Sequence, residues 1–401
     1  MNHFCHLCAR PNPEPLIDFG SHPIAHQLLM NPTQAEYTHP VILGFCEGCG
    51  LAQLIDPIPA EKLYTNYHFL SSWKWNPHVP RLLKMIEDLS DVKKDSTILE
   101  VGSNDGSFLA DLVKRGYSNV HGLEPAGDAV AAAEQRGVKT RRGYFTPRVA
   151  QELAATIGPC DLLISRQVLE HVTNLQEFAT AMRAILRPGA HVLVEVPNFG
   201  FNLQAPDYSA IWEEHVNHFT LATLSRFLLD TGIEVLQSET AVFSGDILIA
   251  LGRYSDTHAK TTTPLTETRR KTLAYRDHWP NFRKALVDYL TEQKITFGKI
   301  AVYGAGCRSC CLINYAGLGA QLEFVVDDQP EKHGKFMPGS RLPILPSHAL
   351  TRHGIAVCLL AVNAENEDKV IGNHKHFLER DGRFVSVHPP SSRLPAFWKP
   401  I

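Results

Sequence analysis

Apolar runs alternate with helix-like patterns through the middle of the chain. Residues 96–113 combine an apolar run, a glycine-rich turn and a stretch with helical spacing. Further apolar runs at 120–124, 160–165 and 186–198 mark additional strands. Because strands that alternate with helices form parallel sheets, we expect a nucleotide-binding α/β domain over residues 81–255.

The last third of the chain repeats this order of strand, turn and helix. Residues 257–264 form a polar linker, and residues 265–296 predict a long amphipathic helix. A strand, a Gly-x-Gly turn and a helix follow from Lys299. We therefore expect a second Rossmann-like domain over residues 256–401, although a lone Gly-x-Gly turn is weak evidence of a bound nucleotide.

Length and charge place the chain among ordinary globular proteins. Its 401 residues include 39 Lys and Arg and 42 Asp and Glu, a net charge of −3, and 44% are hydrophobic. At roughly 150 residues per domain, this length predicts two or three domains. Nucleic-acid partners require clustered basic residues, so the near-neutral charge argues against them. Without a signal-like start or an 18-residue apolar run, we expect a cytoplasmic protein with no membrane partner.

Four cysteines near the start of the chain form two Cys-x-x-Cys pairs. They are Cys5, Cys8, Cys46 and Cys49. Two such pairs can supply the four thiolates of a tetrahedral zinc site, so we predict a closed structural site with no open position for catalysis. His3 and His6 are alternative ligands, and a redox role for one pair is a less favoured alternative.

An aromatic segment closes this small zinc-binding domain, which we place at residues 1–80. Its rings are Tyr64, Tyr67, Phe69, Trp73 and Trp75. The segment has neither helical nor alternating spacing, so the rings either pack the zinc-binding domain onto its neighbour or line a site. Their spacing alone favours packing.

The turn after the first strand of the middle domain is typical of a cofactor site. Gly102 lets a ligand approach the backbone closely, but the turn lacks the Gly-x-Gly-x-x-Gly pattern of dinucleotide sites. The next strand ends in Glu124, about twenty residues on, where a carboxylate can accept hydrogen bonds from ribose hydroxyls. No basic phosphate ligand accompanies it and acids suit a sulfonium, so we expect S-adenosylmethionine rather than NAD. The residues assigned to this site are Glu100, Gly102, Asn104, Asp105, Glu124 and Gln167.

Five segments, together with the cysteine pairs, resemble one known family. They read LEVGSNDGSFL, GLEPAGDAV, VLEHVTNLQEF, LRPGAHVLVEVPN and IWEEHVNHFT. They are similar to segments of the zinc-containing, S-adenosylmethionine-dependent sugar C-methyltransferases, which act on nucleotide-activated deoxy-ketosugars. The resemblance covers nearly the whole chain. It implies a Rossmann-like methyltransferase domain, a C-terminal domain that helps hold the substrate, and a nucleotide-sugar as the small-molecule partner.

The resemblance also implies roles for individual residues. Tyr67, His171, Glu214 and His215 match the family's catalytic positions. C-methylation requires that the carbon beside a ketone lose a proton, and a histidine oriented by a carboxylate can accept it. We therefore expect His215, oriented by Glu214, to be the base. Arg308 matches a family lysine and is expected to face the substrate diphosphate.

Three departures from the family pattern leave the substrate open. Trp212, the pair Arg166 and Gln167, and Phe243 stand where the family has a tyrosine, an asparagine pair and a histidine-containing segment. The last of these lies where the family surrounds its sugar. An O- or N-methyltransferase with the same scaffold is therefore one alternative, and a noncatalytic nucleotide-binding assembly module is another. The sequence carries no signal for the oligomeric state.

Overall fold

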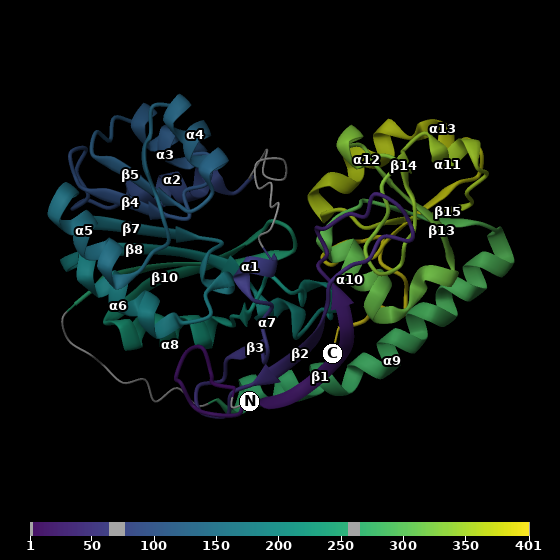
Figure 1. Cartoon of the computed structure of the whole chain (residues 1–401), viewed down its shortest axis with the longest axis horizontal. Helices are drawn as coiled ribbons and strands as arrows, with labels where there is room; N and C mark the ends of the chain where they lie inside the picture. Colours follow the sequence, from purple (N-terminus) through teal and green to yellow (C-terminus); the bar gives the residue numbers. More distant parts are fainter. Residues whose placement is uncertain (1–2, 64–76, 256–264, 401) are drawn as a thin grey trace.

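The computed structural model describes residues 3–63, 77–255 and 265–400, which form three β-sheets with helices packed around them (Figure 1). The fold is mixed α/β, as the sequence predicted. The N-terminal sheet shares one apolar cluster with the C-terminal unit, and the cysteine pairs share another with the central unit. The predicted aromatic segment, Tyr67 included, lies outside the described residues.

The N-terminal sheet has four antiparallel strands in the order β1-β2-β3-β9. Its elements are β1 (Glu14–Pro23), β2 (Thr38–Phe45), β3 (Ala52–Leu54), β9 (Asn217–His218) and the short helix α1 (Ala60–Leu63). The fourth strand comes from the middle of the chain, because Asn217 pairs with Gln53 and His218 with Ala52. The N-terminal sheet therefore extends beyond the 1–80 limit and includes a segment next to the predicted catalytic residues.

The central sheet has seven strands in the order β10-β11-β8-β7-β4-β5-β6. Its strands are β4 (Ile98–Val101), β5 (Val120–Glu124), β6 (Lys139–Arg142), β7 (Cys160–Arg166), β8 (Leu186–Pro197), β10 (Ile233–Val242) and β11 (Asp246–Tyr254). Its helices are α2 (Val79–Glu87), α3 (Ser107–Lys114), α4 (Gly127–Gln135), α5 (Pro147–Ile157), α6 (Leu175–Ile185), α7 (Phe199–Asn202) and α8 (Leu221–Thr231), with 3-10 turns η2 (Leu169–His171) and η3 (Tyr208–Ala210). Strands β6, β5, β4, β7 and β8 run parallel, so their carboxyl ends meet at one edge.

The C-terminal sheet has five parallel strands in the order β14-β13-β12-β15-β16. Its strands are β12 (Ile300–Tyr303), β13 (Leu322–Asp327), β14 (Ile344–Pro346), β15 (Val357–Leu360) and β16 (Arg383–Ser386). Its helices are α10 (Cys307–Ala316), α11 (Ala349–Arg352), α12 (Glu367–Asn373) and α13 (Lys375–Leu378), with 3-10 turns η4 (Leu318–Ala320), η5 (Pro330–Lys332) and η6 (Ala364–Asn366). The predicted second Rossmann-like unit is therefore present.

Helix α9 (Thr266–Phe297) agrees with the amphipathic helix predicted for 265–296. Its Tyr275 and Phe282 are buried in the same apolar cluster as Ile17 and Phe19 of β1. Figure 1 shows α9 running from the N-terminal sheet along the C-terminal unit, so it packs the two together. Within the described ranges, no helix is both long and apolar enough to cross a membrane.

Local sequence signals set the ends of the helices that flank the site. Helix α8 follows Thr220, which forms a capping box with Thr223, and it ends before Gly232 at φ +93°. Helix α6 follows Asn174, whose side chain accepts a hydrogen bond from the Glu177 backbone N–H. These caps fix the chain shortly after each of the two candidate catalytic histidines, Asn174 after His171 and Thr220 after His215.

Candidate functional site

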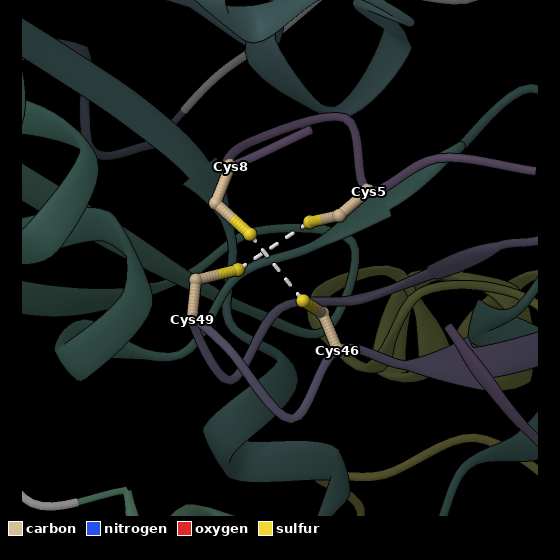
Figure 2. A group of neighbouring side chains, drawn as sticks. All are labelled: Cys5, Cys8, Cys46 and Cys49. Atoms are coloured by element: carbon tan, nitrogen blue, oxygen red, sulfur yellow. Dashed lines mark hydrogen bonds between the residues drawn. The ribbon is translucent and has the colours of Figure 1, made fainter. Parts of the chain in front are cut away.

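Four cysteine sulfurs face one another near the N-terminus (Figure 2). Cys5 Sγ lies 3.4 Å from Cys49 Sγ, and Cys8 Sγ lies 3.5 Å from Cys46 Sγ. A disulfide would require about 2.05 Å, whereas zinc–sulfur bonds of about 2.3 Å in a tetrahedron place the sulfurs about 3.8 Å apart. The distances and the donor set therefore fit the predicted closed zinc site.

The zinc site packs against the helices of the central sheet. Three of its cysteines share an apolar cluster with residues of α6 and α8. His6, an alternative ligand by sequence, has its Nδ1 2.8 Å from Asn217 Oδ1, and its carbonyl accepts a hydrogen bond from the Leu175 N–H. The zinc site therefore holds the segment around Asn217, which leads from the candidate catalytic residues into β9.

The turn after β4 has the shape expected of a cofactor loop. Gly102 has φ +70°, and a Cβ there would lie 2.4 Å from Val168 Cγ2, so only glycine fits without rearrangement. Glu124, at the end of β5, accepts hydrogen bonds from the N–H groups of Asn104 and Ala126, both at 2.9 Å. Burial raises the pKa of Glu124, and the two donors oppose that shift. The structure thus brings Gly102, Asn104 and Glu124 together.

The other two acids predicted for the cofactor site have protein partners. Glu100 Oε1 accepts a hydrogen bond from Arg166 Nε at 3.1 Å, while its Oε2 is buried without a partner among the described residues. Burial raises the pKa of Glu100 to about 7 against the opposing charge of Arg166. Asp105 Oδ2 pairs with Arg136 Nη2 at 2.7 Å. One oxygen of Glu100 therefore remains for a ligand at the end of β4.

Two residues that the sequence did not assign, His78 and Glu195, also join this site. Glu195 Oε2 lies 2.8 Å from His78 Nε2, and its Oε1 accepts a hydrogen bond from Gln167 Nε2 at 3.0 Å. Burial acts to raise the pKa of Glu195, but the hydrogen bond to His78 and the charge of Arg166 hold it below its usual value. Glu195 could have been predicted from the sequence because it is an acid near the end of an apolar strand. No feature of the sequence predicted that His78 would join the site.

The rings of His171 and His215 meet beyond the end of β7. Their centroids are 5.1 Å apart, at an angle of 81° between the ring planes. His171 Nδ1 donates a hydrogen bond to the Glu214 carbonyl at 2.8 Å. Burial lowers the pKa of both histidines, and the positive charge of Arg308 adds to this effect at His215, whose pKa lies well below its usual value. Both rings are therefore neutral near pH 7, which is the form that accepts a proton.

The two acids before His215 contact the N-terminal domain. Glu214 Oε1 lies 2.8 Å from His26 Nδ1, and Glu213 Oε1 accepts a hydrogen bond from the Ala25 N–H at 2.6 Å. Burial and the neighbouring charge of Glu214 raise the pKa of Glu213 to about 7. The sequence expected Glu214 to orient His215, whereas the structure shows its carboxylate contacting His26. Sequence reasoning missed His26 because it lies 188 positions away in a turn after β1.

Arg308 is buried where α10 meets the central unit. Its guanidinium pairs with Asp207, and its Nη1 donates a hydrogen bond to the Ser244 carbonyl at 3.0 Å. Ser244 belongs to the β10–β11 turn, in which Phe243 departs from the family pattern. The guanidinium therefore joins two units through its protein partners, and its contact with a substrate diphosphate stays a prediction.

Three family models match consecutive parts of the chain. The model described as "Putative zinc binding domain" matches residues 5–64, "Methyltransferase domain" matches 73–238, and "C-methyltransferase C-terminal domain" matches 262–389. These matches follow the order of zinc-binding, methyltransferase and C-terminal units that the sequence predicted.

Curated proteins and solved structures are also similar to the chain. C-methyltransferase NovU from Streptomyces niveus is 29% identical over 402 residues, which cover 96% of this chain and 95% of NovU. A ubiquinone biosynthesis O-methyltransferase from Xylella fastidiosa is 25% identical and covers 32% of this chain and 56% of its own length. A solved SAM-dependent methyltransferase from Anabaena variabilis is 15% identical, with a TM-score of 0.38, over 45% of this chain and 86% of that chain. Together, the three family matches and the alignment with NovU show that the chain is an S-adenosylmethionine-dependent methyltransferase with a putative zinc-binding domain, a methyltransferase domain and a C-methyltransferase C-terminal domain.

Proposed function

We propose that this enzyme methylates a carbon atom beside a ketone in a nucleotide-activated sugar. The observation that carries the proposal is the alignment of 96% of the chain with C-methyltransferase NovU. The O-methyltransferase relative aligns with only 32% of the chain, which favours transfer to carbon over transfer to oxygen. The nucleotide-sugar class rests on the motif resemblance and on the second Rossmann-like unit, which offers a place to hold an activated substrate.

In this mechanism His215 takes the proton from the carbon next to the ketone. Its neutral ring has a lone pair near pH 7, and the rings of Trp212 and His171, with centroids 4.1 and 5.1 Å away, limit its orientation. S-adenosylmethionine, which Gly102, Asn104 and Glu124 would hold, would supply a methyl group on a positively charged sulfur to the carbon that His215 deprotonates.

Neighbouring residues position this base. The Glu214 carbonyl accepts a hydrogen bond from His171 Nδ1–H, which fixes the tautomer and orientation of the ring that faces His215. The Glu214 carboxylate contacts His26, so the N-terminal domain supports the same segment. Tyr67 remains a proposed catalytic residue outside the described ranges.

Cofactor binding is assigned to the carboxyl ends of β4, β5 and β7. The proposed residues are Glu100, Gly102, Asn104, Asp105, Glu124 and Gln167. The proposed domain limits are 1–80, 81–255 and 256–401. Strand β9 lies within the second range but pairs with the sheet of the first. A cytoplasmic location suits the four thiols that must stay reduced to bind zinc.

Transfer of a labelled methyl group tests the proposed reaction directly. The enzyme is incubated with a nucleoside-diphosphate deoxy-ketosugar and S-adenosylmethionine that carries a ¹³C methyl group. We expect a product in which the ¹³C signal is coupled to a ring carbon, with the ketone retained. A methyl signal at the chemical shift of an O-methyl or N-methyl group would contradict C-methylation. The sugar without its nucleotide serves as the control for the substrate class, and we expect it to react poorly.

A further inference from the structure

Glu170, immediately before His171, is a buried carboxyl group that the mechanism above does not use. Its side chain lies in η2, the residue is 1% exposed, and both carboxyl oxygens are buried without a hydrogen-bond partner among the described residues. Burial, with the charge of Glu195, raises its pKa well above the usual value. A buried carboxyl group with no partner is costly and is normally satisfied by a proton or a cation.

Two imidazoles stand next to this carboxyl group. One ligand atom from each of Glu170, His171 and His215 lies within 4.8 Å of the others. His171 donates a hydrogen bond from Nδ1–H to the Glu214 carbonyl, so its Nε2 carries the lone pair of the ring. Metal-binding histidines usually make this hydrogen bond to a carbonyl or carboxylate. No hydrogen bond from the described residues reaches the ring nitrogens of His215.

Two histidines and one glutamate are the ligands of many zinc sites that keep a coordination position open. Nitrogen donors favour zinc, cobalt or nickel over magnesium or calcium. The carboxylates of Glu195 and Glu214 act electrostatically on Glu170 and His171 and add negative charge nearby. The positive charge of Arg308, which acts on His215, is paired with Asp207. The ligand types and the local charge therefore both favour a bound cation.

We propose that Glu170, His171 and His215 form a second site for a divalent transition-metal ion such as zinc, and that an ion bound there inhibits methyl transfer. The inhibitory part rests on the proposed function, because the ion would occupy the lone pair that His215 needs to accept the proton. The site differs from the four-cysteine site in donor type and in its open coordination position.

Cobalt binding to the zinc-loaded enzyme tests the site. Cobalt held by nitrogen and oxygen absorbs in the visible range, whereas cobalt that replaces zinc at the cysteines adds an intense near-ultraviolet thiolate band. We expect one additional cobalt ion per chain with visible absorption only. Loss of an outer-shell partner weakens metal binding by roughly tenfold. Glu170→Gln alters a direct ligand, so it should weaken cobalt binding by at least that factor. The control is Glu177→Gln, an exposed position on α6, which should bind cobalt as the wild type does.

Methyl-transfer assays with and without cobalt separate the two proposals. We expect cobalt to inhibit the wild type and Glu177→Gln at the concentration at which the second site fills, and the Glu170→Gln enzyme to resist inhibition. The zinc content and circular dichroism of Glu170→Gln establish that it is folded. Absence of a second bound ion in the wild type would overturn the site while leaving His215 as the proposed base. Cobalt binding that is lost in Glu170→Gln but does not inhibit the wild type would overturn both the inhibition and the base role of His215.

Discussion

His26 is one of the residues through which the N-terminal domain contacts the candidate catalytic segment, because its Nδ1 lies 2.8 Å from Glu214 Oε1. Removal of a hydrogen bond to a charged group costs about 1.5–3 kcal/mol. We expect His26→Ala to lower kcat by roughly ten- to a hundredfold, with an unchanged Kd for S-adenosylmethionine. An asparagine amide can donate in place of Nδ1–H, so His26→Asn should recover most of this activity. Equal activity in all three enzymes would show that Glu214 does not depend on His26.

Glu124 is expected to contact the ribose of the cofactor from the end of β5. Glu124→Ala should weaken S-adenosylmethionine binding by roughly 1–3 kcal/mol through lost hydrogen bonds, as measured by titration calorimetry. Glu134→Ala, at an exposed position on α4, is the matched control. Unchanged affinity in Glu124→Ala would remove this residue from the cofactor site, and tight NADH binding by the wild type would contradict the choice of cofactor.

At the scale of elements, the loop after β4 needs glycine both for its positive φ and because a Cβ would have no space. These two effects can be measured separately. Gly102 and Gly137 have φ of +70° and +79°, but only at Gly102 would a Cβ meet a neighbour, at 2.4 Å from Val168. Gly137→Ala therefore reports backbone strain alone. We expect Gly102→Ala to lower the free energy of unfolding by about 1–3 kcal/mol more than Gly137→Ala, because it adds overpacking. Thermal unfolding measures both, and equal losses would show that the loop yields to the added methyl group.

Elements built from contiguous residues could be predicted, whereas contacts between distant residues could not. The β4 turn and helix α9 follow from local apolar spacing, and the cysteine pairs from their short separation. Strand β9 has two residues, too few for any periodic signal, and it exists because it pairs with β3. His26 and His78 reach the site through tertiary packing alone. We expected Gly102 and Glu124 to bind the cofactor because they lie at the ends of strands, and the apolar spacing of the sequence reveals where those strands end.

Arg308 shows which contacts within the protein a motif match does not reveal. Its position at the start of α10 followed from the strand, turn and helix pattern. The pairing with Asp207 required knowledge of how α10 packs on η3 of the central unit. A buried cation needs an anionic partner, and the local sequence around Arg308 does not predict which residue that partner is.

For the whole molecule, zinc removal should affect more than the N-terminal sheet. The purified protein should contain about one zinc ion per chain, bound by the four cysteines. Its removal should unfold β1 to β3, because structural zinc supplies folding free energy. Since β9 and His26 depend on that sheet, we expect methyl transfer to be lost with the metal.

Elemental analysis, hydrogen exchange and activity before and after chelation test this coupling. Cys46→Ser should lose zinc, and Cys160→Ser, which lies in β7 outside the cluster, should retain it. Freshly purified protein without zinc would contradict the assignment. Full methyl-transfer activity in zinc-free protein would show that the catalytic segment does not need the N-terminal sheet.

Exchange of the substrate α-proton for deuterium tests most directly whether His215 is the base. The assay uses a nucleoside-diphosphate deoxy-ketosugar in deuterium oxide without a methyl donor, with the uncatalysed exchange subtracted. We expect the wild type to exchange this proton and His215→Ala to be slower by at least about a hundredfold, while binding S-adenosylmethionine as the wild type does. Exchange at the wild-type rate in His215→Ala would contradict the central claim and would transfer the role of base to His171 or Tyr67.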